Sequence, residues 1–115
     1  MRVSAIVLFA LAAACGSSDK SPTNPSVNKS VDVFTLPEAF SPNFVQINAG
    51  DTVRFVITPG SENQGHDVTF DAKVGAPPNI KVTLNGTVPR VFATRGTFHF
   101  NCFVHPGMSG DVVVQ

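Results

Sequence analysis

The sequence predicts an all-β fold, a Greek-key β-sandwich or barrel of seven to eight strands. Apolar residues recur with a period of two almost everywhere, and turn residues interrupt them at short intervals. No window has the periodicity of an amphipathic helix. The chain has ten phenylalanines and neither tryptophan nor tyrosine, which indicates a core built around phenylalanine rings.

Each expected strand is a short alternating run that is closed by a turn signal. Pro59-Gly60 ends the run 52–58, and Asn85-Gly86 is a strong hairpin dipeptide between two later runs. This spacing is typical of a sandwich or a Greek-key barrel. The expected strands are 31–36, 44–48, 52–58, 67–71, 80–84, 87–93, 97–102 and 110–115, and the phenylalanines expected in the core are Phe55, Phe70, Phe92, Phe98 and Phe100.

Residues 1–14 are expected to be a signal peptide of the lipoprotein type. Arg2 gives a minimal basic region, an apolar run follows as far as Leu11, and three alanines precede Cys15. The end of this segment resembles the bacterial lipobox, after which the cysteine becomes the lipidated N-terminus, although Leu11 is four rather than three residues before Cys15. The alternative is ordinary export, with Cys15 removed or left free.

The two cysteines and the segment between the signal and the first strand define the domain organisation. Residues 15–30 are expected to be a lipidated Cys15 and a flexible linker, because small polar residues and two prolines dominate 16–30. The folded domain is then 31–115. A Cys15–Cys102 disulfide is a less favoured alternative, since each cysteine has a separate use. We therefore expect an exported protein of the bacterial cell envelope or periplasm, anchored to a membrane by its lipid.

Charge gives no sign of a charged partner. Eight basic and eight acidic residues leave the chain without net charge, and neither sign forms a run. A basic patch for nucleic acid is therefore not expected, and a nearly neutral, partly apolar docking surface is.

The run from Cys102 to Met108 brings a thiolate, the imidazole of His105 and a thioether close together. A cysteine and two histidines with a long axial methionine are typical of blue-copper electron-transfer sites. The strand 97–102 alternates, so Cys102 should share the inward side of its phenylalanines. His66 follows a flexible loop and begins a strand that should reach the same end of the sandwich. Zinc is the rival metal, but a thioether is a poor zinc ligand.

These residues give the chain a resemblance to the cupredoxins, the type 1 blue copper proteins of the plastocyanin, azurin and amicyanin group. The segments 40–47, 50–53, 66–70 and 96–110 carry it, and the Cys-x2-His-x2-Met spacing is similar to the short amicyanin loop. The resemblance implies a cupredoxin domain with one type 1 copper ion. His66, Cys102 and His105 would be the equatorial ligands, and Met108 the axial one.

Three neighbours of the ligands should adjust such a site. Many family members have asparagine after the first histidine, where this chain has Asp67; its carboxylate could cap the ligand loop while lowering the copper potential. Val104 replaces a common proline, so a free N–H that pointed at the sulfur would raise the potential. Gly65 could offer a weak carbonyl contact on the second axial side.

The expected function is electron transfer by a type 1 copper ion that cycles between Cu(I) and Cu(II) at the cell envelope. The alternatives are periplasmic copper sequestration or delivery, and a metal-free, immunoglobulin-like surface lipoprotein. An enzyme is not expected, because copper enzymes of this kind need a second, histidine-rich centre and the chain has three histidines.

The expected partners are redox proteins and, through Cys15, a membrane, with the protein itself a monomer. His105, on the exposed loop, is expected to be the electron exit. Phe103, Pro106 and Met108 are expected to form the apolar docking rim.

Overall fold

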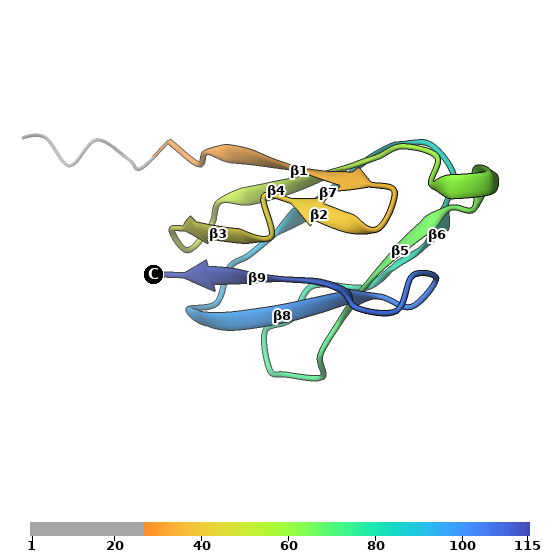
Figure 1. The fold of residues 1–115 in the computed structure, drawn as a ribbon. Helices are drawn as coiled ribbons and strands as arrows, with labels where there is room; N and C mark the ends of the chain where they lie inside the picture. The colour runs from red at the N-terminus through yellow and green to blue at the C-terminus, as the bar shows by residue number, and fades with distance from the viewer. Residues whose placement is uncertain (1–26) are drawn as a thin grey trace, which may run out of the picture.

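The computed structural model describes residues 27–115, so the predicted signal peptide, Cys15 and most of the linker lie outside the described residues. Nine strands in two facing sheets make up this part of the chain (Figure 1). They are β1 (Ser30–Leu36), β2 (Ala39–Ser41), β3 (Phe44–Ile47), β4 (Thr52–Ile57), β5 (His66–Phe70), β6 (Ile80–Thr83), β7 (Gly86–Val91), β8 (Gly96–Cys102) and β9 (Met108–Val114). The predicted all-β sandwich is therefore confirmed.

The two sheets differ in size and strand order. One has the order β2-β1-β4-β7, and the other has the order β3-β9-β8-β5-β6. The strand beyond the expected number is β2, which has three residues and pairs antiparallel with β1. A segment this short has too few residues to show an alternating pattern, although its Phe40 is buried.

Phenylalanine rings fill the space between the sheets, as predicted. Phe55, Phe70, Phe92, Phe98 and Phe100 are all buried, and Phe100 makes edge-on contacts with its neighbours. Its ring centroid lies 5.4 Å from that of Phe55 and 6.0 Å from that of Phe70. Such edge-to-face pairs add about 0.5–1.5 kcal/mol each beyond burial of their area. The core therefore holds β8 and β5 in fixed positions, and each strand carries a metal-ligand candidate at one end.

The described chain begins and ends at one end of the sandwich, and the loop between β8 and β9 lies at the other (Figure 1). Asp51 holds the segment just before β1 in place. Its buried carboxylate accepts the backbone N–H groups of Lys29 at 2.8 Å and of Asn48 at 2.9 Å. At the opposite end, the 3₁₀ turn η1 (Ser61–Asn63) precedes β5. None of the helices in the described part of the chain is long and apolar enough to cross a membrane.

Candidate metal centre

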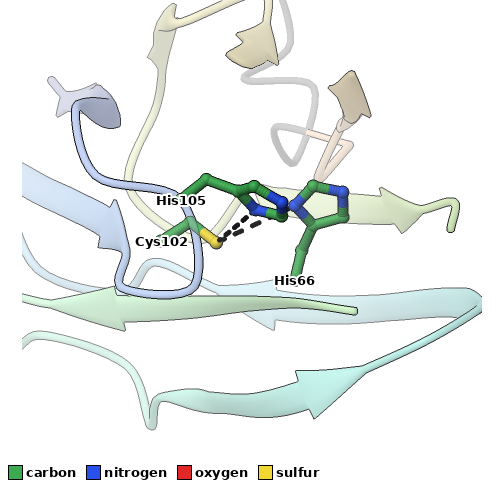
Figure 2. Close-up of side chains that lie close together, drawn as sticks. All are labelled: His66, Cys102 and His105. Carbon is green, nitrogen blue, oxygen red and sulfur yellow. Dashed lines mark hydrogen bonds between the residues drawn. The ribbon is translucent and has the colours of Figure 1, made fainter. Parts of the chain in front are cut away.

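Three predicted ligands converge at the end of the sandwich that carries the β8–β9 loop. His66 is the first residue of β5, Cys102 is the last residue of β8, and His105 lies in the loop that follows. The Sγ atom of Cys102 lies 3.8 Å from Nδ1 of His66 and 3.8 Å from Nδ1 of His105. Figure 2 shows the thiol directed at both rings, whose centroids are 4.7 Å apart. Within residues 27–115 they form a group that could hold a metal ion.

The spacing of these atoms fits a single metal ion that contacts all three. With the bond lengths of zinc sites, about 2.3 Å to sulfur and about 2.0 Å to nitrogen, trigonal angles would separate sulfur from nitrogen by about 3.7 Å. Tetrahedral angles would bring them to about 3.5 Å. Both observed separations are 3.8 Å, and all three donor atoms lie within 4.8 Å of one another, so they are close enough for one ion to contact each of them.

Met108 is placed beside this group by strand pairing. It is the first residue of β9 and stands directly opposite Cys102 in the β8–β9 ladder. Residues directly opposite in antiparallel strands direct their side chains to the same face. Met108 is 2% exposed, and its backbone N–H donates to the carbonyl of His105 at 3.1 Å. The ladder therefore brings the thioether to the side where the other three donors meet.

Burial sets the protonation of the metal-free site. Burial lowers the pKa of His66 below its ordinary value of 6.5, the charge of His105 lowers it further, and Asp67 opposes both. Burial also raises the pKa of the Cys102 thiol, although the backbone N–H groups of Asp67, His105 and Val104 favour the thiolate. His66 is therefore a neutral imidazole ready to ligate, whereas the thiol must lose a proton when metal binds.

Asp67 ties the ligand loop to β5, as the sequence predicted for a carboxylate at this position. Its Oδ1 accepts the backbone N–H of Phe103 at 2.8 Å and that of Val104 at 3.3 Å. Its Oδ2 accepts the hydroxyl of Thr69 at 2.7 Å. Asp67 is 6% exposed, so these three bonds satisfy a carboxylate that would otherwise be costly to bury.

The structure differs in part from the prediction that the Val104 N–H points at the Cys102 sulfur. Its N–H was expected to be free for the sulfur, but it is donated to Asp67 Oδ1. It still lies close enough to Cys102 to favour the thiolate. A carboxylate is a stronger acceptor than a metal-bound sulfur, so we take Asp67 as its main partner.

Gly65 has a structural reason to be glycine. A Cβ at this position would lie 2.6 Å from the carbonyl oxygen of Thr83, so β5 could not approach β6 with a larger residue here. Its carbonyl contact with a metal remains a prediction.

Two predictions about the surface of the site are wrong. His105 was expected to lie on an exposed loop as the electron exit, but it is 8% exposed and its Nε2 atom is buried. Met108 was expected in the apolar docking rim, but it lies inside. Phe103, at 71%, and Pro106 are exposed as predicted.

Gly60 covers the histidines and was missed as a site residue. A Cβ at Gly60 would lie 3.0 Å from Nε2 of His66 and 3.1 Å from Cε1 of His105. The sequence showed Pro59-Gly60 only as the end of a strand. The one available signal was the length of the polar run before His66, which leaves enough chain to fold back over the site.

No protein-family model and no curated protein matches the chain. Several solved structures are similar to it. A pseudoazurin from Methylobacterium extorquens AM1 is 28% identical with a TM-score of 0.59, over 74% of this chain and 74% of that one. The reduced form of an amicyanin mutant is 26% identical with a TM-score of 0.63, over 75% and 82%. The oxidised plastocyanin from Dryopteris crassirhizoma, at 24% identity and a TM-score of 0.58, shares the fold over 74% and 100%.

The chain has the cupredoxin fold and the cupredoxin ligand set. Its two histidines, cysteine and methionine form a group that suits one type 1 copper ion. The resemblance inferred from the residues is therefore confirmed for the fold and for the donors. Lipidation of Cys15 stays a prediction, because that residue lies outside the described part of the chain.

Proposed function

We propose that this protein is a one-electron carrier that holds a type 1 copper ion and works at the bacterial cell envelope. The observation that carries the proposal is the placement of two imidazole Nδ1 atoms 3.8 Å from one buried thiol. Strand pairing adds a thioether. A copper ion held there would supply the Cu(I)/Cu(II) couple, and a related amicyanin structure is described as Cu(I).

The protein around the donors favours electron transfer because it holds them still. His66 and Cys102 lie on strands that pack on the phenylalanine core, and Asp67 fastens the loop that carries His105. Ligands that keep their positions in both oxidation states leave little to reorganise when an electron arrives. This is the same benefit that preorganised groups give an enzyme.

Copper sequestration or delivery is the competing function, and burial argues against it. His66 and Cys102 are at most 2% exposed, and the loop containing Gly60 lies over both histidines. A protein that hands its metal to an acceptor needs donors that the acceptor can reach. Zinc is disfavoured by the thioether.

The position of the N-terminal segment is consistent with a membrane-anchored carrier. The described chain begins at the end of the sandwich opposite the metal centre (Figure 1). A linker fixed to a membrane at Cys15 would therefore attach at the far end of the domain and leave the metal centre free to contact partner proteins.

Voltammetry of the copper-loaded protein tests this function. We expect a reversible one-electron wave with equal anodic and cathodic currents, and retention of copper in the presence of an equimolar Cu(I) chelator. Copper that passes rapidly to the chelator, together with an irreversible wave, would support delivery and contradict the carrier. The matched control is Met108→Leu, which removes the thioether from the same buried position and should change the potential without removing the wave.

A further inference from the structure

We propose that electrons are exchanged through Phe103 and the groove beside it, and that the partner protein presents an apolar side chain next to a carboxylate. This inference rests on the proposed electron-transfer function and identifies the surface that serves it. It replaces the electron exit through His105 that the sequence suggested.

The route through His105 is closed by the polypeptide. The loop 60–64 folds into a compact turn in which Gly60 N–H donates to the carbonyl of Gln64 at 2.9 Å. Gly60 lies against both imidazole rings, and the four residues that follow it are all exposed. His105 itself is 8% exposed and its Nε2 atom is buried, so a partner cannot contact that edge of the imidazole directly.

Phe103 offers a direct route to the surface. It is joined by one peptide bond to Cys102, and its side chain is 71% exposed. The hydrogen bond from Phe103 N–H to Asp67 Oδ1 fixes this peptide unit relative to β5. The exposed ring is therefore linked to the thiolate by a short run of covalent bonds through a fixed peptide unit, whereas His105 is enclosed.

A groove of about 560 Å³ adjoins the Phe103 ring, and the residues that line it indicate which partner it would accept. Its lining is largely apolar and includes Phe103, Val104, Ile80 and Val82. Its two charged residues are Asp67, which is buried with its oxygens already bonded, and Lys81, which is exposed. Within residues 27–115 Lys81 forms no ion pair. An apolar side chain flanked by a carboxylate would complement this lining and satisfy the Lys81 charge.

The proposed transfer moves one electron and nothing else. The reduced centre loses one electron and an oxidised one-electron acceptor gains it, with no proton or bond exchanged. Phe103 and the Asp67-anchored peptide stay in place throughout. The acceptor is therefore a redox protein or, in the test below, an inorganic complex.

Two probes locate the surface with the full copper-loaded protein. The first is oxidation of the reduced protein by hexacyanoferrate(III). We expect Phe103→Ala to slow it at least about threefold and Lys81→Gln to slow it about threefold at low salt, with the Lys81 effect fading as salt screens the charge. The matched controls are Phe44→Ala and Lys29→Gln, which make the same changes elsewhere on the surface and should stay within about twofold of the parent.

The second probe is hexacyanochromate(III), a paramagnetic and redox-inert anion of the same charge. In NMR spectra of the reduced protein it should broaden the amide signals of Lys81, Phe103 and Val104. Broadening centred on Ser61–Asn63, together with an unchanged rate in Phe103→Ala, would overturn the proposal. If the protein binds copper and gives a reversible wave, that result leaves the carrier function standing. A protein that forms no redox-active copper centre refutes the function itself.

Discussion

Oδ1 of Asp67 lies 2.8 Å from the backbone nitrogen of Phe103 and accepts its hydrogen bond. This bond joins the neighbour of one metal-ligand candidate to the neighbour of another. Asp67 follows His66, and Phe103 follows Cys102. One carboxylate therefore fixes the relative positions of the two strands that supply these ligands. It also places a negative charge beside the metal centre, which should stabilise Cu(II) over Cu(I).

Replacing this carboxylate by its amide tests the charge. Asp67→Asn can still accept the Phe103 N–H but removes one unit of charge, which at protein-like effective dielectric is worth about 1–3 kcal/mol. The copper potential should therefore rise by about 40–130 mV, as measured by voltammetry. Asp71→Asn, an exposed change of the same kind, should shift it much less. A fall in the Asp67→Asn potential would contradict the assignment.

The N–H of Val104 is the second adjustable contact of the loop. Val104→Pro removes it, leaving Asp67 with less compensation and the thiolate with one fewer nearby donor. Both effects favour Cu(II), so the potential should fall, on the order of 30–60 mV if the bond is worth about 1 kcal/mol. An unchanged or higher potential sinks this interpretation. Val104→Ala, which keeps the N–H, is the control.

Gly110 is where β9 passes closest to the core. A Cβ there would meet the ring of Phe100 and would lie 2.8 Å from the carbonyl oxygen of Asn43. Gly110→Ala should therefore lower the free energy of unfolding by about 2–3 kcal/mol, as expected for overpacking. Urea denaturation of the metal-free protein measures this. Ser109→Ala adds no Cβ and should cost less than about 0.5 kcal/mol; equal effects for the two variants would show that the close approach is unimportant.

His99 gives the stability a pH dependence that is independent of the metal ligands. On the outer face of the β8–β9 ladder, its Nδ1 lies 2.8 Å from Oδ1 of Asp111. This bond, with the nearby charges of Asp111 and Asp71, raises the pKa of His99 above its ordinary value of 6.5, and burial opposes the rise only in part. At pH values between 6.5 and the raised pKa of the folded state, the folded protein therefore binds more protons at His99 than the unfolded protein does.

The stabilisation from His99 should be complete below pH 6.5 and be lost as the pH rises through the folded-state pKa. Unfolding free energies of parent and His99→Gln should therefore differ more at low pH than at high pH. Because both side chains are well exposed, the difference will be small. An NMR titration that places the pKa of His99 at or below 6.5 would show the pair to be ineffective.

The sequence was sufficient for the fold and the donor set because both follow local rules. Alternation along 97–102 places Cys102 on the buried side with Phe98 and Phe100, and the structure has it there. The spacing from Cys102 to Met108 likewise fits a loop that turns back so that the two residues stand opposite each other. Such inferences need only the geometry of a strand and a tight loop.

The surface of the site could not be predicted because it depends on a contact between distant segments. Whether His105 is exposed is decided by the loop 60–64, which is more than forty residues earlier in the chain. Its polar composition is typical of any exposed loop, and nothing in it shows which neighbour it covers. The bond from Asp67 to the ligand loop was predicted from the family resemblance, because a carboxylate can accept the backbone N–H groups that an asparagine amide would cap at this position.

Addition of Cu(II) to the purified protein, followed by visible absorption, tests the central claim most directly. We predict an intense blue thiolate-to-copper charge-transfer band that saturates at one copper per chain, with no such band in Cys102→Ser. A protein that stays colourless, or a band that survives in Cys102→Ser, would contradict a type 1 copper centre at His66, Cys102, His105 and Met108.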